Sequence, residues 1–150
     1  MDCSIAQCLE VVGEWWSLLI IRDGFYGITR FDVFQQRLGI SRNILQQRLQ
    51  RLCDAGIFEK VPYCERPLRH DYRLTEKGRD LFPILMTLQQ WGDRYAAPAG
   101  RPVQVVHRAC GSDAHAVLTC PTCGQPVGHD EVEHRPGAGR PSDRPLLEVG

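Results

Sequence analysis

The sequence predicts a mainly helical α+β fold with a β-hairpin wing, a winged helix-turn-helix, followed by a small β ribbon-like C-terminal extension. Three observations predict this fold. Apolar residues recur every three or four positions through most of residues 3–95, which is the period of amphipathic helices. Two of these helical segments are joined by a tight turn and followed by a charged hairpin pattern. After Tyr95 the helical period ends, and a segment containing Cys and His begins.

The first helical segment lies between Cys3 and Asp23 and forms one amphipathic helix or two short ones. Gly13 falls inside this segment and is expected to break or bend it, because glycine weakens a helix interior. Residues 24–27, Gly-Phe-Tyr-Gly, predict the turn that follows the segment.

The next two helices form the helix-turn-helix. Thr29 or Arg30 opens the first of them, and Gly39 ends it, since glycine favours the left-handed conformation found after many helices. Ser41 is expected to cap the second helix, over residues 41–54. The apolar stripe of this second helix consists of Leu45, Leu49 and Leu52, with Ile44 beside it. The polar side chains between them are therefore expected to face outward.

A β-hairpin is predicted after the second helix. Residues 57–61 predict its first strand, which Pro62 is expected to break because proline lacks a backbone donor. Residues 64–69 predict the turn, and residues 70–74 predict the second strand.

One further helix is predicted between Thr75 and Tyr95, with Pro83 in its first turns, where proline is tolerated. Residues 1–96 are therefore expected to form one winged helix-turn-helix domain. Residues 97–134 predict a small Cys/His ribbon-like module, with a short strand at 103–106. Residues 135–150 are rich in Pro and Gly and predict a flexible tail.

The charge distribution indicates an anionic partner for the helix-turn-helix. The formal net charge of the whole chain is zero. Residues 30–79 carry eleven Lys or Arg against six Asp or Glu, a net charge of +5, whereas residues 1–29 carry −3 and residues 80–150 carry −2. A local basic segment of this kind is what contact with nucleic-acid phosphates requires.

Side chains of the second helix of the motif are expected to contact base edges in double-stranded DNA. Arg, Asn and Gln make the paired hydrogen bonds by which proteins recognise bases. The candidates on this helix are Ser41, Arg42, Asn43, Gln46, Gln47 and Arg51. Arg48 lies nearer the apolar stripe, so it serves either a phosphate or an internal ion pair.

Basic residues flank this helix in the sequence. Arg66, Arg69 and His70 lie around the predicted hairpin turn and favour contact with phosphates or with the minor groove. Arg30, just before the first helix of the motif, is a candidate phosphate clamp. The alternative interpretation is a winged-helix module that docks a protein partner and leaves these basic residues solvated.

Taken together, these segments resemble the HxlR-type branch of the MarR-like winged-helix transcription regulators, over roughly residues 3–95. The residues that carry the resemblance are Cys3, Gly13-Glu14-Trp15-Trp16, Arg22-Asp23-Gly24, Arg30-Phe31, Gly39-Ile40-Ser41, residues 45–49, Leu52, Ala55-Gly56-Ile57, residues 72–78 and Trp91. The resemblance implies a homodimer that binds an inverted repeat, most often as a repressor. It also implies a small-molecule or oxidant effector, sensed in several members through a cysteine at the position of Cys3. Ser4 stands where that family usually has proline.

The C-terminal Cys/His module predicts a structural zinc site. His107 and Cys110 form one pair, Cys120 and Cys123 form a second, and a glycine follows each pair. Three thiolates and one imidazole suit tetrahedral zinc, and a full ligand set leaves no open position for catalysis. The alternatives are a ribbon that folds by packing alone, a Cys120–Cys123 disulfide, or a thiol oxidoreductase built on that pair.

The remaining features bound the location and the function class. No apolar run reaches the length of a transmembrane span, and the N-terminal residues lack the pattern of a secretory signal. The seven cysteines are therefore expected to be reduced thiols or metal ligands in the cytoplasm. Paired carboxylates, a nucleophile elbow and a phosphate loop are all missing from the sequence, so we expect a regulator and not an enzyme.

Overall fold

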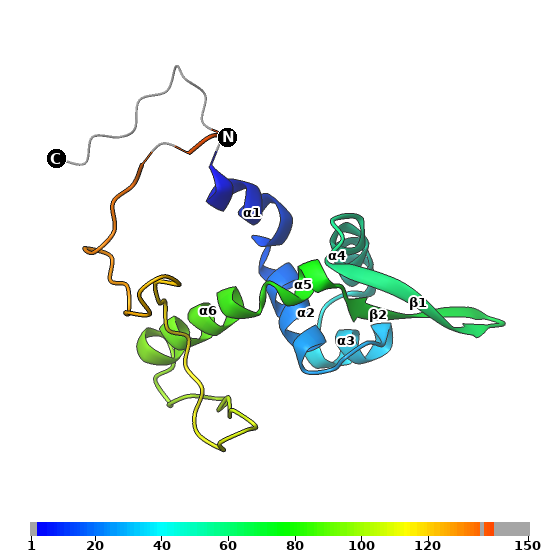
Figure 1. Cartoon of the computed structure of the whole chain (residues 1–150). Coiled ribbons are helices and arrows are strands. Elements are labelled where there is room, and N and C mark those ends of the chain that lie inside the picture. The colour runs from blue at the N-terminus through cyan, green and yellow to red at the C-terminus, as the bar shows by residue number, and fades with distance from the viewer. Residues whose placement is uncertain (1–2, 136, 140–150) are drawn as a thin grey trace.

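The computed structural model describes residues 3–135 and 137–139. Two N-terminal helices meet at a sharp corner (Figure 1). α1 spans Ser4–Val12, α2 spans Trp15–Phe25, and the two are bent by 77°. At the corner, a Cβ added to Gly13 would stand 2.4 Å from the Leu9 carbonyl oxygen. The expected break at Gly13 is confirmed, and this close backbone approach explains why a glycine stands there.

The helix-turn-helix consists of α3 (Phe31–Leu38) and α4 (Arg42–Asp54). Gly39 ends α3 in the left-handed region, with φ of 63°, a conformation that costs glycine little. Ser41 caps α4, because its hydroxyl oxygen accepts a hydrogen bond from the backbone N–H of Ile44 at 3.4 Å. Both predicted helix ends are therefore confirmed.

The hydrophobic core lies among α2, α3, α4 and the base of the hairpin. Its fully buried side chains are Ile20, Ile21, Phe34, Leu45, Leu49, Leu52 and Phe58. The rings of Phe34 and Phe58 meet edge to face, with centroids 6.2 Å apart. The predicted apolar stripe of α4 is thus confirmed as the buried face, and the burial of that face fixes which side chains α4 presents outward.

A buried carboxylate joins α2 to α3. The side chain of Asp23 is fully buried, and its oxygens lie 2.8 Å from Nη2 of Arg22 and 3.2 Å from Nε of Arg37. Both arginines still reach solvent with about half of their side chains. The charge of Asp23 is therefore fully paired, as a buried carboxylate requires, and the pairing holds α3 against α2.

The hairpin is longer than predicted. β1 spans Phe58–Glu65 and pairs with the antiparallel β2, Leu68–Leu74. The predicted break at Pro62 is wrong, because β1 continues past it and the register shifts between Pro62 and Cys64. A proline is compatible with a bulge in a two-stranded sheet, where each strand is an edge. The added length makes the hairpin project from the body of the molecule as a wing (Figure 1).

The predicted helix between residues 75 and 95 is divided. α5 spans Glu76–Arg79 and α6 spans Phe82–Tyr95. Pro83 accounts for the division, since a proline cannot donate to the carbonyl four residues earlier and its ring crowds that carbonyl. At the start of α6 the missing donor costs no helical hydrogen bond.

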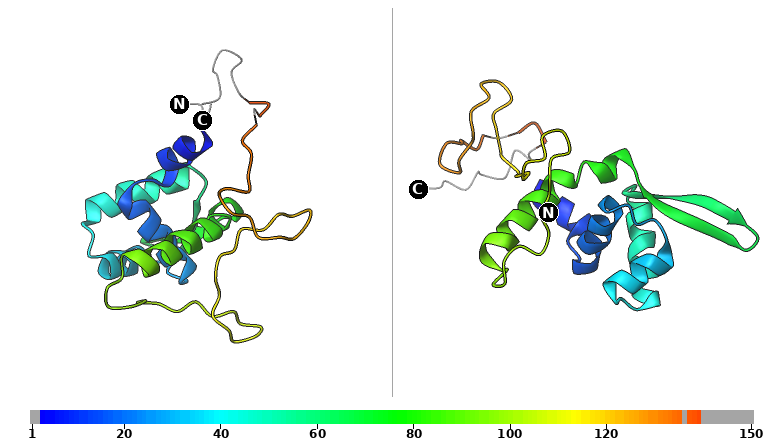
Figure 2. Two further views of the ribbon diagram at one scale, coloured as in Figure 1. Left: turned by 90° about the vertical axis from the view of Figure 1, so that its left-hand side faces the viewer. Right: turned by 90° about the horizontal axis from the view of Figure 1, so that it is seen from below.

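Beyond α6 the chain runs beside that helix without forming a regular strand in the described residues (Figures 1 and 2). The expected strand at 103–106 is therefore wrong, although Val106 makes an isolated bridge with Asp113. Gln89 Nε2 donates to the Val103 carbonyl at 3.3 Å, and the backbone N–H of Ala116 donates to the side-chain oxygen of Gln90 at 3.0 Å. Two glutamines of α6 thus hold this extension.

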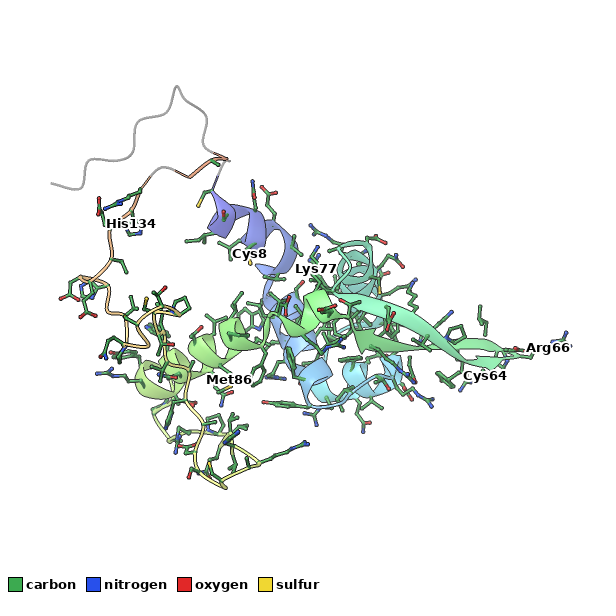
Figure 3. All side chains as sticks on the ribbon, viewed as in Figure 1. Cys8, Cys64, Arg66, Lys77, Met86 and His134 are labelled. Atoms are coloured by element: carbon green, nitrogen blue, oxygen red, sulfur yellow. The ribbon has the colours of Figure 1, made fainter. Side chains whose placement is uncertain are left out.

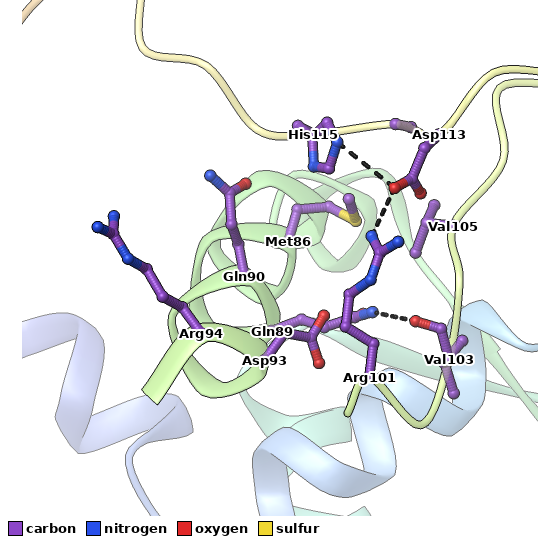
Figure 4. A pocket seen from close by; sticks show the side chains of 11 residues that line it. Met86, Gln89, Gln90, Asp93, Arg94, Arg101, Val103, Val105, Asp113 and His115 are labelled. Carbon is purple, nitrogen blue, oxygen red and sulfur yellow. Dashed lines mark hydrogen bonds and ion pairs between the residues drawn. The ribbon is translucent and has the colours of Figure 1, made fainter. Parts of the chain in front are cut away.

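A small cavity of about 220 Å³ lies between α6 and the extension (Figure 4). On its rim Arg101 donates to the carboxylate of Asp113 at 2.5 Å, and Nε2 of His115 lies 3.5 Å from the same oxygen. The hydrogen bond from Arg101 lowers the pKa of Asp113. Arg101 and Asp113, on the rim of the cavity, are therefore paired with each other.

The predicted division into residues 1–96, 97–134 and 135–150 stays a prediction. Most of the predicted tail, residues 136 and 140–150, lies outside the described residues. In the described part of the chain, no single helix is long and apolar enough to cross a membrane; α1 and α2 meet that test only together, as a bent pair.

Candidate nucleic-acid interface

An open groove runs between α4 and the wing, and Phe31 and Asp32 of α3 also line it. The side chains that α4 contributes to it are Arg42, Asn43, Gln46, Gln47, Arg48, Gln50 and Arg51. The side chains that the wing contributes are Lys60, Tyr63, Leu68, Arg69, His70 and Tyr72. The structure thus brings together all the predicted DNA-contact residues except Arg30, Ser41 and Arg66.

The polar face of α4 is held toward this groove by the burial of its opposite face. Arg42, Asn43, Gln46 and Gln47 are all exposed. The guanidinium of Arg42 also lies 5.2 Å from the ring centroid of Phe31, which orients it at the start of the helix. The four side chains predicted to contact bases are therefore free to do so.

The wing places its basic residues at two levels. Arg66 lies at the tip (Figure 3), beyond the groove, whereas Arg69 and His70 follow on β2 and line the groove. The tip therefore offers a positive charge well away from α4. The third predicted residue outside the groove, Ser41, is engaged as the cap of α4.

Arg30 has a different environment from the one expected for a phosphate clamp. Its Nε lies 2.8 Å from Oδ1 of Asp71, and its guanidinium lies 3.5 Å from the ring centroid of Tyr63. Asp71 also accepts a hydrogen bond from the hydroxyl of Thr29 at 3.2 Å. These contacts fasten the wing to the start of α3, and a phosphate contact by Arg30 stays a prediction.

Glu14 engages two arginines of α4. Its carboxylate oxygens lie 2.6 Å from Nη2 of Arg48 and 3.6 Å from Nη1 of Arg51. Of the two roles expected for Arg48, the structure shows the internal ion pair. Because Glu14 is the residue that precedes α2, the corner between α1 and α2 is linked directly to α4.

Lys60 is a groove residue that the sequence analysis missed. Its Nζ donates to the side-chain oxygen of Gln50 at 2.5 Å, which connects the wing to α4. Lys60 lies two residues after the buried Phe58, and alternation along a strand puts both on the same side. That alternation is the signal from which the position of Lys60 beside α4 could have been predicted.

Cys3 lies at the N-terminal cap of α1 and is exposed. The backbone N–H groups of Ala6 and Ile5, at the start of α1, lower the pKa of the Cys3 thiol. Cys53 contrasts with it, because partial burial raises the pKa of the Cys53 thiol. Of the two, Cys3 has the chemistry expected of a reactive cysteine.

The predicted zinc ligands form two pairs in the structure. Nδ1 of His107 lies 3.3 Å from the sulfur of Cys110, and the N–H of Cys123 lowers the pKa of the Cys120 thiol. Within the described residues, no group of three or more His, Cys, Asp or Glu side chains could hold a metal ion. The structure therefore does not gather all four around one point, and zinc stays a prediction.

Comparison with known proteins identifies the family. The HxlR-like helix-turn-helix family matches residues 11–99, which include α4 and the whole wing. The chain belongs to the HxlR-like helix-turn-helix family. It is also 45% identical over 137 residues to an uncharacterised HTH-type transcriptional regulator of Mycobacterium tuberculosis, covering 91% of this chain and 87% of that one.

Solved structures agree with the HxlR-like assignment. PA1607, described as a candidate transcription factor, has a TM-score of 0.80 and 40% identity, covering 89% of this chain and 94% of that one. The oxidised form of the redox regulator HypR has a TM-score of 0.57 and 30% identity, covering 61% of this chain and 96% of HypR. This HxlR-like protein is therefore a winged helix-turn-helix, DNA-binding transcriptional regulator.

Proposed function

We propose that this HxlR-like protein is a homodimeric repressor that binds an inverted repeat in double-stranded DNA. In the complex, α4 of each protomer enters the major groove and the wing follows the neighbouring phosphates. The groove between α4 and the wing carries this proposal, because Arg, Asn and Gln line its helical wall and α4 has no acidic residue before Asp54. Repression follows where the bound dimer excludes RNA polymerase from the promoter.

Exposed apolar side chains support a second copy of this chain as the partner in the dimer. On α1 they are Ile5 and Leu9, and on α6 they are Ile84, Leu88, Trp91 and Tyr95. Trp91 is 62% exposed and lies 5.5 Å from the ring of Tyr95. The wing projects from the other side of the molecule (Figure 1), so a dimer formed through α1 and α6 leaves both wings free for DNA.

The position of Cys3 supports a response to oxidants. HypR, which is 30% identical to this chain, is a redox regulator, and Cys3 is an exposed thiol of lowered pKa on α1. Hydrogen peroxide would transfer one oxygen atom to the thiolate, which takes up a proton to give a sulfenic acid, and the other oxygen would leave as water. Because α1 belongs to the proposed dimer surface, this change would alter how the two α4 helices are spaced.

Fluorescence anisotropy on DNA from upstream of the protein's own gene, titrated with salt, tests this function. The native protein is expected to bind this duplex more tightly than a scrambled one, with affinity falling steeply as salt rises. Gln46→Ala should weaken selective binding by about 1–3 kcal/mol. The control is Gln125→Ala, which removes the same side chain from an exposed position of the C-terminal extension. Unchanged selectivity in Gln46→Ala would contradict the role given to α4.

A further inference from the structure

The extension contains the same hydrogen-bonded turn twice, thirteen residues apart. In the first turn, the N–H of Gly111 donates to the carbonyl of His107 at 2.8 Å, and the N–H of His107 donates to the carbonyl of Ser112 at 2.9 Å. In the second turn, the N–H of Gly124 donates to the backbone carbonyl of Cys120 at 2.8 Å, and the N–H of Cys120 donates to the backbone carbonyl of Gln125 at 2.9 Å. Each pair of hydrogen bonds closes a turn around two candidate metal ligands.

The repeat extends to the residues that flank each turn. The N–H of Ala114 donates to the carbonyl of Val105 at 2.8 Å, and the N–H of Val127 donates to the carbonyl of Leu118 at 2.9 Å. The isolated bridges repeat in the same register, Val106 with Asp113 and Thr119 with Pro126. Two unrelated loops would not be expected to share three hydrogen bonds and a bridge at matching positions, so a common requirement shaped both.

Both turns are built around a glycine in the left-handed conformation. Gly111 has φ of 70° and Gly124 has φ of 72°. This conformation follows directly after the second ligand of each pair, Cys110 or Cys123, and reverses the chain tightly. A packed core does not explain such turns, because His107, Cys110 and Cys123 are exposed. Binding of an ion by His107, Cys110, Cys120 and Cys123 would explain them.

We propose that the extension binds one zinc ion per chain through His107, Cys110, Cys120 and Cys123. Each turn supplies two ligands that are spaced as in known zinc sites, and together they give the three sulfurs and one nitrogen that tetrahedral zinc accepts. Each turn is thus half of the site, formed before the metal arrives. All seven cysteines are free, so none of these sulfurs is held in a disulfide.

Binding requires the two turns to close on each other, since the four ligands are not gathered in the described structure. The link between them, residues 115–119, is tied to α6 by the hydrogen bond from Ala116 to Gln90. Val117 and Leu118 of this link are 66% and 72% exposed. Bending the link therefore disturbs no buried contact, and zinc would convert two separate turns into one ribbon.

Metal analysis of the full chain tests the proposal. Purified protein is expected to carry one zinc ion per chain, and the metal-free protein to take up one Co²⁺. Co²⁺ should then give the visible bands of tetrahedral coordination and the ultraviolet absorption of cobalt–sulfur bonds. Zinc below a tenth of an ion per chain, together with no such spectrum, would overturn the site. Half an ion per chain would overturn its assignment to four ligands of one chain.

Matched variants keep the test independent of folding. Cys123→Ser and His107→Ala should each lose the ion, whereas Cys64→Ser, which changes a thiol in the wing, should keep it. His107→Cys should retain the ion and add sulfur-to-cobalt absorption, because four thiolates also hold zinc. Loss of metal from Cys64→Ser, or no change in the cobalt spectrum of His107→Cys, would contradict the assignment. The readout does not use DNA, so it stands apart from the proposed repression.

Discussion

Arg48 and Arg51 lie on the helix that is proposed to read DNA, yet both have a carboxylate partner within the protein. Glu14 lies 2.6 Å from Arg48 and 3.6 Å from Arg51. A phosphate that approaches these arginines meets a group that is already paired. Glu14 is therefore expected to limit how strongly α4 attracts DNA of any sequence.

Glu14→Gln is predicted to raise affinity for DNA of any sequence and to steepen its salt dependence by roughly one unit of slope, since phosphates then meet unpaired arginines. Stability should fall by about 1 kcal/mol or less, because the ion pair is partly exposed. Anisotropy titrations over a range of salt concentrations would measure the slope. Glu10→Gln removes the same charge from α1 and is the control. Equal effects of the two variants would contradict a specific role for Glu14.

The thiols of Cys3 and Cys53 are predicted to react at different pH. Backbone N–H groups at the start of α1 lower the pKa of Cys3, and burial raises the pKa of Cys53. A lowered pKa means that thiolate forms at lower pH, so alkylation of Cys3 by iodoacetamide should begin at a lower pH than that of Cys53. Mass spectrometry of the labelled peptides measures both profiles. The profiles should converge in urea, and a difference that persists there would show that the fold is not its cause.

Residues whose role depends on the local pattern were predicted well. Ser41, Leu45 and Leu49 follow from helix period and capping alone, and the structure gives them the expected places. The ion pairs and hydrogen bonds of Asp23, Asp71 and Glu14 were not predicted. Their partners stand as far as 42 residues away, as Thr29 does from Asp71. Such pairing appears only when the fold brings distant residues together.

At the scale of elements, only part of the wing could be predicted from the sequence pattern. The two strands of the hairpin were predictable, but the bulge between Pro62 and Cys64 was not. Judged from the sequence alone, a proline predicts the end of a strand. Here it is accommodated, because the neighbouring strand continues past it and Arg30 contacts both Asp71 and Tyr63 beside the bulge.

Gly78 is predicted to be essential for the packing of α5. An added Cβ would lie 2.2 Å from the Ile57 carbonyl oxygen, and backbone there cannot move aside cheaply. Gly78→Ala should therefore lower the free energy of unfolding by about 3 kcal/mol, as overpacking does. Gly92→Ala in α6 is the control, since nothing lies within 4 Å of its added Cβ. Urea unfolding followed by circular dichroism measures both, and equal stability of the two variants would contradict the clash.

For the whole molecule, the helical domain and the extension differ in how far the sequence predicts them. The domain has a buried core, so apolar periodicity predicts its helices. The extension has no buried apolar residue in its described part. Apolar periodicity therefore cannot predict its structure, and the strand expected at 103–106 does not form. Its regularity lies in the repeated backbone turns, which depend on glycine positions rather than on hydrophobic pattern.

Trp91→Glu is predicted to weaken the homodimer by about 2 kcal/mol or more, because a charge replaces an aromatic side chain at the centre of the proposed interface. Sedimentation velocity over a range of protein concentrations measures the change. Leu68→Glu places the same charge at an exposed position of the wing, and it should weaken DNA binding without changing the mass of the assembly. A dimer that survives Trp91→Glu unchanged would place the interface elsewhere.

The length of the wing has a consequence for the DNA that surrounds the repeat. Eight residues of β1, at about 3.3 Å each, span about 26 Å. Half a turn of B-DNA is only about 17 Å. In the proposed complex, the Arg66 end of the wing would therefore reach the minor groove next to the bases assigned to α4, outside the proposed repeat. Arginine is attracted there by the narrow grooves of A-tracts. Operators flanked by A-tracts should then be preferred over operators of identical core sequence, with the preference set by groove shape and carried by a residue that touches none of the recognised bases.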